Sequence, residues 1–215
     1  MSPKRSAAYM SAVLDFAESW GGETDAERLA REVAADYDAR PISPGLASYL
    51  TLLAKSLFAR NVVEVGTGTG ISATALLKGM TADGILTSID PENELQLRVK
   101  ELLKASNIPA RKARLIAGNP LDVLEKLTDH NYDLVFISGD PLEYVEYVEQ
   151  ALRLLRPGGA FVLNNVFWKG KVPDEHNDED EPLIIREALE AASAPDNVTT
   201  AIIPLDDGLL VGLVE

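Results

Sequence analysis

An apolar, β-branched run breaks into three alternating glycines near residue 62, and this feature limits the folds open to the chain more than any other. Residues 62–70 read VVEVGTGTG. Such a run predicts a buried strand that opens onto a tight turn and a helix. Glycines there allow positive φ angles and bring free amides of the helix close to a ligand. The segment therefore predicts a nucleotide-binding turn.

An acidic residue supports this prediction. Asp90 ends the next apolar run, residues 85–89, where a carboxylate accepts hydrogen bonds from ribose hydroxyls. The spacing of Gly66, Gly68 and Gly70 is one residue short of the fingerprint of NAD-binding folds. The glycine spacing alone leaves NAD and S-adenosylmethionine both open.

Composition sets the class of protein. A chain of 215 residues with 46% hydrophobic content suits one well-buried domain. It has no cysteine, which excludes disulfides and thiolate metal sites, and no apolar run long enough to span a membrane. The net charge of -14 repels nucleic acid and anionic lipid surfaces. We expect a soluble, cytoplasmic protein that binds neither nucleic acid nor membrane.

Strands and helices alternate along most of the chain. Helical periodicity covers about residues 9–20, 25–37 and 43–60, with a capping box at Thr24 and Glu27. Strands are expected near 61–66, 85–90, 113–117, 133–138 and 160–165, with helices near 70–80, 92–106, 119–127 and 141–155 between them. Two final strands, 198–204 and 209–214, form an antiparallel hairpin. The order predicts an α/β, Rossmann-like, doubly wound seven-stranded sheet, mostly parallel, with helices on both faces. The acidic segment 174–181 is interpreted as a solvated loop.

Further motifs carry a family resemblance from about Ile42 to the end. They are Ile42-Ser43-Pro44, Glu64-Val65-Gly66 with Ser72, Ile89-Asp90, Gly118-Asn119-Pro120, Arg156-Pro157-Gly158-Gly159, Asn165 with Trp168, Gly170 and Val172, and Pro204-Leu205-Asp206-Asp207-Gly208-Leu209. Together they resemble class I S-adenosylmethionine-dependent methyltransferases, in particular small bacterial O-methyltransferases of the catechol and caffeoyl-CoA type. The resemblance implies a methyltransferase domain over residues 41–215, preceded by a helical segment, 1–40, that packs on the same core and, as in relatives, supports a homodimer.

The resemblance also assigns the cofactor. Glu64 orders the glycine turn and meets the amino group of S-adenosylmethionine, and Ser72 binds its carboxylate at a helix start. The resemblance implies that Asp90 holds the ribose hydroxyls. The remaining implied cofactor residues are Gly66, Thr67, Gly68 and Gly70 in the turn, and Gly118, Asn119 and Pro120 along the adenine edge.

At the acceptor end the chain departs from its relatives. They hold a divalent metal between one acid after the fourth strand and an Asp-Asn pair after the fifth, with a lysine as base. Here Ser138, Asn164 and Pro141 stand in place of the two acids and the lysine, and only Asn165 is retained. Neutral oxygens are poor ligands for Mg²⁺, so these metal positions are degenerate and we expect no divalent metal.

The candidate catalytic and acceptor-binding residues lie near these positions. Asn165 and Asp140 are the catalytic candidates; Asp140 could instead orient the cofactor or cap the helix at Pro141. Phe167 and Trp168 are expected either to line the acceptor pocket or to provide hydrophobic cover for the sheet. Tyr144 reaches the pocket or packs in the core, and Ser43 completes the candidate acceptor-binding set.

Three functions follow from these residues. The first is S-adenosylmethionine-dependent O-methyl transfer to a small phenol or catechol-like acceptor. The second keeps the cofactor pocket with lost or diverted catalysis, which the degenerate metal positions suggest. The third is an NAD-linked oxidoreductase, against which the missing second βαβαβ half argues.

Overall fold

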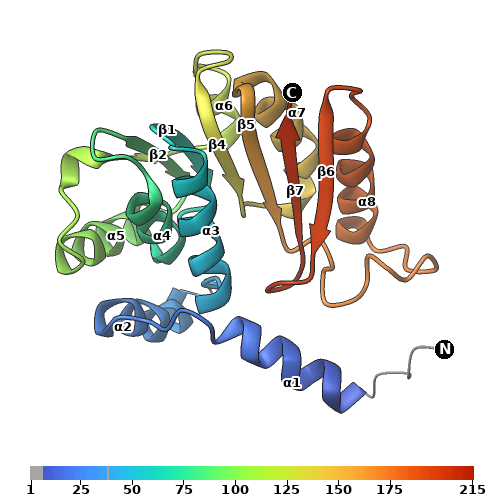
Figure 1. The fold of residues 1–215 in the computed structure, drawn as a ribbon, viewed down its shortest axis with the longest axis horizontal. Helices are drawn as coiled ribbons and strands as arrows, with labels where there is room; N and C mark the ends of the chain where they lie inside the picture. The colour runs from blue at the N-terminus through green and yellow to red at the C-terminus, as the bar shows by residue number, and fades with distance from the viewer. Residues whose placement is uncertain (1–6, 38) are drawn as a thin grey trace.

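A mixed seven-stranded sheet forms the centre of the computed structural model, which describes residues 7–37 and 39–215 (Figure 1). The strands are β1 (Asn61–Val65), β2 (Ile85–Asp90), β3 (Ala113–Ala117), β4 (Tyr132–Ile137), β5 (Leu155–Asn164), β6 (Val198–Ile203) and β7 (Leu209–Val214). Their order is β3-β2-β1-β4-β5-β7-β6, and β7 runs in the opposite direction to the other six strands. The predicted doubly wound sheet with a terminal antiparallel hairpin is confirmed.

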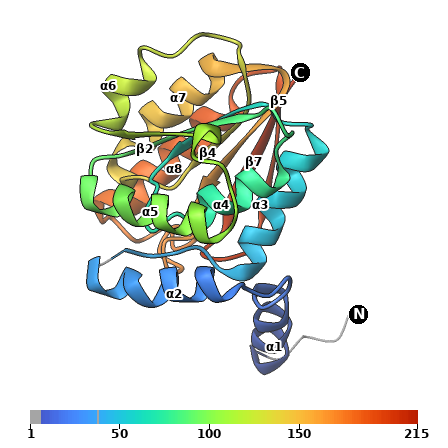
Figure 2. The ribbon, with the colours of Figure 1, turned by 90° about the vertical axis from the view of Figure 1, so that its left-hand side faces the viewer.

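Alternate strand residues bury their side chains on opposite faces, so each face needs its own helical layer. Val62 and Phe136 pack under α3 (Pro44–Ser56), α4 (Ile71–Gly79) and α5 (Asn93–Ala105). Val63 and Val135 pack under α6 (Pro120–Leu124), α7 (Tyr144–Leu154) and α8 (Asp180–Ser193). Figure 2 shows α3, α4 and α5 together on one side of the strands. Among the described residues, no helix has the length and apolar character needed to cross a bilayer.

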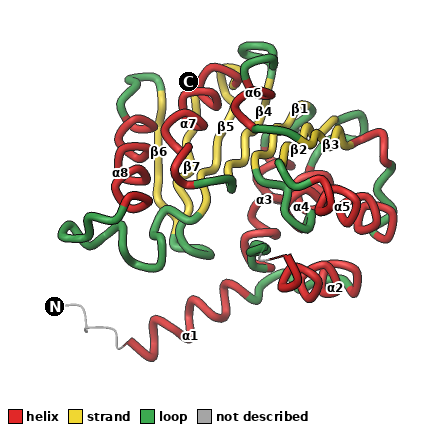
Figure 3. Tube along the Cα trace, turned by 180° about the vertical axis from the view of Figure 1, so that it is seen from behind, coloured by secondary structure: helices red, strands yellow, loops and turns green. Residues whose placement is uncertain are grey.

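Two further helices precede this core. α2 (Asp25–Ala34) begins at the expected capping box, where Thr24 N donates to Glu27 Oε2 at 2.9 Å and Glu27 N donates to Thr24 Oγ1 at 3.3 Å. Lys78 of α4 pairs with Glu27 at 2.6 Å and holds α2 against the core. α1 (Ala7–Glu18) contacts α3, and Glu18 at its end accepts a hydrogen bond from Asp206 N in the turn between β6 and β7. The start of α1 projects away from the sheet (Figures 1 and 3).

Two sequence expectations need correction. The acidic segment 174–181 is not all loop, because Asp180 and Glu181 form the first turn of α8, where acidic side chains suit the helix dipole. The turn at Arg156–Gly159 does not precede the fifth strand but interrupts it, since β5 begins at Leu155 and its pairing with β4 shifts register there.

Candidate active site

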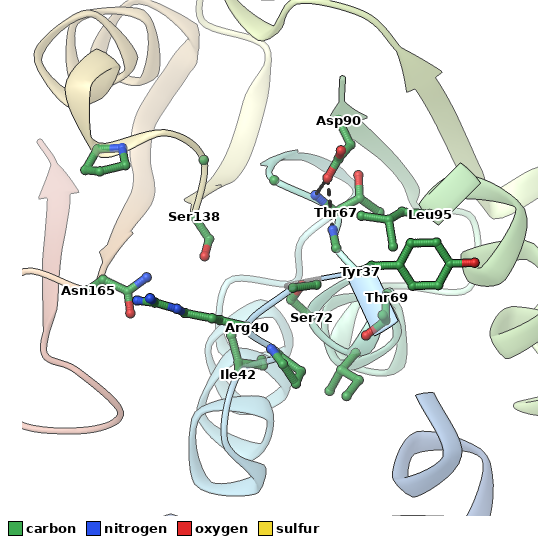
Figure 4. A pocket seen from close by; sticks show the side chains of 18 of the residues that line it. Tyr37, Arg40, Ile42, Thr67, Thr69, Ser72, Asp90, Leu95, Ser138 and Asn165 are labelled. Carbon is green, nitrogen blue, oxygen red and sulfur yellow. Dashed lines mark hydrogen bonds between the residues drawn. The ribbon is translucent and has the colours of Figure 1, made fainter. Parts of the chain in front are cut away.

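A cavity of about 430 Å³ opens at the carboxyl ends of β1, β2, β4 and β5 (Figure 4). The helix after β1 covers one face of the sheet and the helix after β4 covers the other. The cavity therefore lies where the connections switch from one face to the other, and open α/β sheets bind ligands at such a point. The volume of the cavity lies within the roughly 300–1,000 Å³ typical of small-molecule sites. The lining residues are Tyr37, Ala39, Arg40, Pro41, Ile42, Gly66, Thr67, Gly68, Thr69, Gly70, Ile71, Ser72, Asp90, Leu95, Ser138, Gly139, Pro141, Asn165 and Trp168.

The glycine turn forms one wall of the cavity. Gly66, Gly68 and Gly70 have φ of 87°, 50° and 90°, which confirms the predicted left-handed turn. A Cβ on Gly66 would collide with the Ser138 carbonyl, whereas a Cβ on Gly68 would meet no atom within 4 Å. Gly66 is therefore needed for packing, and Gly68 keeps a strip of backbone open toward the cavity.

Asp90 organises this turn from the neighbouring strand. Its Oδ2 accepts from Thr67 N at 2.8 Å and Gly68 N at 3.0 Å, and its Oδ1 accepts from Glu92 N at 2.9 Å. A carboxylate offers about four lone pairs, so these amides leave about one for a ligand. Asp90 thus has room to accept one ribose hydroxyl rather than to hold the whole ribose alone.

A buried carboxyl lies beneath the turn. Glu64 is fully buried, and Ser88 Oγ donates to its Oε2 at 2.5 Å while sharing a 2.6 Å hydrogen bond with Thr67 Oγ1. Burial raises the pKa of Glu64 to about 7, against the stabilising hydroxyls of Ser72 and Ser88. Glu64 reaches the turn through Ser88 and Thr67, but it does not line the cavity. Contact with the amino group of a ligand would have to pass through Ser72, which does line it.

The neutral side chains expected at the acceptor end are close together. Asn164 Nδ2 donates to Ser138 Oγ at 3.2 Å, and Ser138 and Asn165 line the cavity opposite the glycine turn (Figure 4). No carboxylate lies among these three side chains, so they do not fit a site for Mg²⁺. Within residues 7–37 and 39–215, no group of three or more His, Cys, Asp or Glu side chains is arranged to hold a metal.

Two candidates do not line the cavity. Asp140 is exposed, and its Oδ1 accepts from Leu142 N at 3.0 Å, so it caps the short 3₁₀ turn Pro141–Glu143. Tyr144 is fully buried, and its hydroxyl donates to the Asn164 carbonyl at 3.0 Å. The structure supports the capping and packing alternatives for Asp140 and Tyr144.

The remaining acceptor candidates divide between two hollows. Trp168 lines the main cavity. Phe167 and Ser43 line a neighbouring hollow of about 270 Å³, together with Leu14 and Asp206. Ser43 also caps α3 by accepting from Leu46 N at 3.1 Å. Only Trp168 of these candidates meets the cavity that the glycine turn lines.

The segment expected along the adenine edge adjoins the cavity without lining it. Gly118 N donates to the Asp90 carbonyl at 3.2 Å, and Asn119 caps α6 by accepting from Asp122 N at 3.2 Å. Pro120 is buried as the first residue of that helix. Their role toward adenine stays a prediction.

Sequence reasoning missed the segment that closes the cavity. Tyr37, Arg40 and Ile42 line it from the connection between α2 and α3, and Leu95 of α5 faces them (Figure 4). The sequence signal for Tyr37 and Arg40 was their place just before the Ile42-Ser43-Pro44 motif, to which Ile42 itself belongs. Irregular backbone of this kind has no periodicity from which its position can be inferred.

Comparisons with known proteins agree with this geometry. A family model described as O-methyltransferase matches residues 26–214. A protein of Mycobacterium sp. (strain JLS), provisionally named an O-methyltransferase, is 40% identical over 200 residues, covering 93% of this chain and 91% of that protein. The solved structure of the O-methyltransferase TomG from Streptomyces achromogenes, involved in tomaymycin synthesis and in complex with S-adenosylmethionine, is similar with a TM-score of 0.85 and 27% identity, over 94% of this chain and 96% of that one. The O-methyltransferase from Bacillus cereus, in complex with S-adenosylhomocysteine, shares the fold with a TM-score of 0.85 and 24% identity, over 95% and 97% of the two chains.

Proposed function

Because this chain belongs to the O-methyltransferase family, we propose that it transfers the methyl group of S-adenosylmethionine to the hydroxyl of a small phenol or catechol-like acceptor. The observation that carries this proposal is one cavity with the glycine turn on one wall and neutral hydrogen-bonding side chains on the other. The family match favours methyl transfer over the NAD-linked oxidoreductase that the glycine turn alone left open.

The residues at the glycine wall suit each part of S-adenosylmethionine, which supplies an electrophilic methyl group when bound. Ser72 lies in the first turn of α4, where the helix dipole and the backbone amides at the helix start favour a carboxylate. Asp90 offers its free lone pair to a ribose hydroxyl. Tyr37 and Leu95 provide flat and apolar surface on the Asp90 side of the cavity, which suits a purine.

Acceptor chemistry at the other wall needs no metal in this proposal. Displacement requires the acceptor oxygen about 3 Å from the methyl carbon and largely deprotonated. Asn165 and Ser138 have hydrogen-bond donors for a phenolate oxygen, and Trp168 offers an aromatic wall for its ring. Ser138 and Asn165 are not bases, so the acceptor loses its proton to solvent before reaction. The rate is therefore expected to rise with pH toward the pKa of the phenol, about 10 for a simple phenol.

The test is transfer of isotope-labelled methyl groups to a panel of phenols and catechols, with and without EDTA. We expect product in both conditions. Activity that EDTA abolishes and Mg²⁺ restores would refute the metal-free site. As a matched control, the double variant Ser138→Asp, Asn164→Asp places carboxylates at the two degenerate positions and should gain Mg²⁺ binding in a calorimeter.

A second candidate function comes from the same residues. Asn164 and Ser138 are hydrogen-bonded to each other, and neither supplies the charge that relatives use. A protein that binds S-adenosylmethionine without transferring its methyl group would show cofactor affinity by calorimetry and no product with any acceptor in the panel. Turnover with one acceptor excludes this candidate.

We also propose that the protein is a cytoplasmic homodimer, with residues 1–40 packing on the 41–215 domain and supplying the contact. Support comes from α1 and the turn after it, where Val13, Phe16 and Trp20 are 43%, 66% and 65% exposed. Apolar side chains that are exposed in one chain and lie at helical spacing are typical of a surface that a second protein chain covers. Light scattering on the wild type and on Phe16→Asp tests the assembly, and a monomeric wild type would refute it.

A further inference from the structure

Arg40 is the one basic side chain among the described residues that line the cavity. Figure 4 shows it extending across the opening toward Asn165, away from Asp90. Among the described residues it makes no hydrogen bond or ion pair. A guanidinium in a ligand cavity without a partner of its own is available to a ligand.

The backbone directly after Arg40 is held by contacts with α2 and with the terminal hairpin. Arg31 of α2 donates to the Pro41 carbonyl at 3.3 Å and to the Ile42 carbonyl at 2.7 Å, and Ile42 is buried. Ser43 N donates to Asp206 of the terminal hairpin at 3.0 Å. Arg40 therefore starts from an anchored position at the cavity edge, which reduces the cost of ordering it on a ligand.

The charges around Arg40 favour an anion at the acceptor end. Ser138, Asn164 and Asn165 are neutral there, so no carboxylate among them competes for the guanidinium. Asp90 is the one acidic side chain of the described lining, and backbone amides already engage it on the opposite side. Arg40 is therefore the one charged side chain of the described lining at this end of the cavity.

We propose that Arg40 binds a carboxylate carried by the methyl acceptor, so that the substrate is a hydroxylated aromatic acid. The proposal rests on the proposed methyl transfer and narrows its substrate class. A guanidinium presents parallel N–H donors that match the two oxygens of a carboxylate, and this pair is among the stronger charge-assisted contacts. With the acid held by Arg40, the aromatic ring lies in the part of the cavity that Ser138 and Trp168 line.

Equilibrium binding tests the contact without requiring turnover. The ligands are protocatechuate and its uncharged methyl ester, titrated calorimetrically into protein saturated with S-adenosylhomocysteine. We expect wild type to bind the acid more tightly than the ester. Arg40→Gln should lower the affinity for the acid by about 10-fold and change the affinity for the ester by no more than about 2-fold. The loss for the acid is modest because an exposed charge pair is partly screened. Lys169→Gln is the matched control, since it removes the same charge beside Trp168 from a residue that does not line the cavity.

Three results would overturn the proposal. Equal loss of acid and ester binding in Arg40→Gln would mean that Arg40 contacts the ring or its hydroxyl. A weaker affinity for S-adenosylhomocysteine in Arg40→Gln would assign the guanidinium to the cofactor carboxylate. An equal loss of acid affinity in Lys169→Gln would show that Arg40 acts through the general electrostatic field of the protein and makes no specific contact with the acid.

Failure of the proposed function gives a different pattern. If no acceptor is methylated but the acid still binds through Arg40, methyl transfer fails and the carboxylate site stands. If phenols are methylated with no preference for acids and no dependence on Arg40, methyl transfer stands and the carboxylate site fails.

Discussion

Replacing Glu64 by glutamine should make the protein more stable above neutral pH. Burial raises the pKa of Glu64 from 4.5 to about 7, so the folded protein holds this proton more tightly than the unfolded chain does. The stability from the bound proton is complete below pH 4.5 and is lost as the pH rises through about 7. Glutamine has a similar shape, accepts from Ser88 and has no proton to lose.

The magnitude follows from the two pKa values. A difference between 4.5 and about 7 is worth about 3 kcal/mol at roughly 1.4 kcal/mol for each tenfold change in proton affinity. The free energy of unfolding of the wild type should therefore fall by about 3 kcal/mol relative to Glu64→Gln between pH 4 and pH 8. The comparison removes titrations that both proteins share.

Urea denaturation at a series of pH values measures this difference. Glu149→Gln is the matched control, because it makes the same replacement at an exposed position on α7. Parallel stability curves for wild type and Glu64→Gln would refute the reasoning, since they would show that Glu64 has the same proton affinity folded and unfolded.

Two further perturbations test the cofactor wall. Asp90→Ala removes the acceptor of two turn amides and a proposed ribose contact, and should weaken S-adenosylhomocysteine binding by about 1.5 to 3 kcal/mol in a calorimeter; unchanged affinity would contradict the placement of the ribose. Gly68→Ala places a methyl group in open space, so it should lower the free energy of unfolding by about 1 kcal/mol, because of its left-handed φ, and should weaken cofactor binding by more than that. Gly66→Ala should mainly lower the free energy of unfolding, by about 1–3 kcal/mol, because its Cβ meets the Ser138 carbonyl. Equal stability losses with unchanged affinity in both glycine variants would show that the turn does not face the ligand.

The parts of the fold read correctly from sequence are those with a local physical signal. The alternation of apolar runs and amphipathic helices located the parallel strands, because buried strands and two-faced helices have different periods. The three glycines were informative because a left-handed backbone is costly for other residues. Helix α8 was missed although Ile185, Ala188 and Ala192 are buried at helical spacing, because the acidic residues before it were interpreted as one loop.

Side-chain direction at the site was the harder problem. Asp140 follows β4 at the cavity edge in sequence, yet the 3₁₀ turn after it draws its carboxylate to Leu142 N. Tyr144 opens α7, and its hydroxyl reaches the Asn164 carbonyl inside the core. A shift of one residue at a helix start rotates a side chain by about 100°, so its target cannot be inferred from its place in the chain.

The sequence by itself determined the sheet, the glycine turn and the neutral side chains Ser138, Asn164 and Asn165 after the fourth and fifth strands, because these depend on residue type and on short-range backbone preference. Only the tertiary structure decided which side chains meet at the cavity. Arg40 lies there because Arg31 holds the segment after it and Ser43 contacts Asp206, 163 residues away in the chain. Contacts between segments so far apart form only when the whole core has packed, and no local pattern records them.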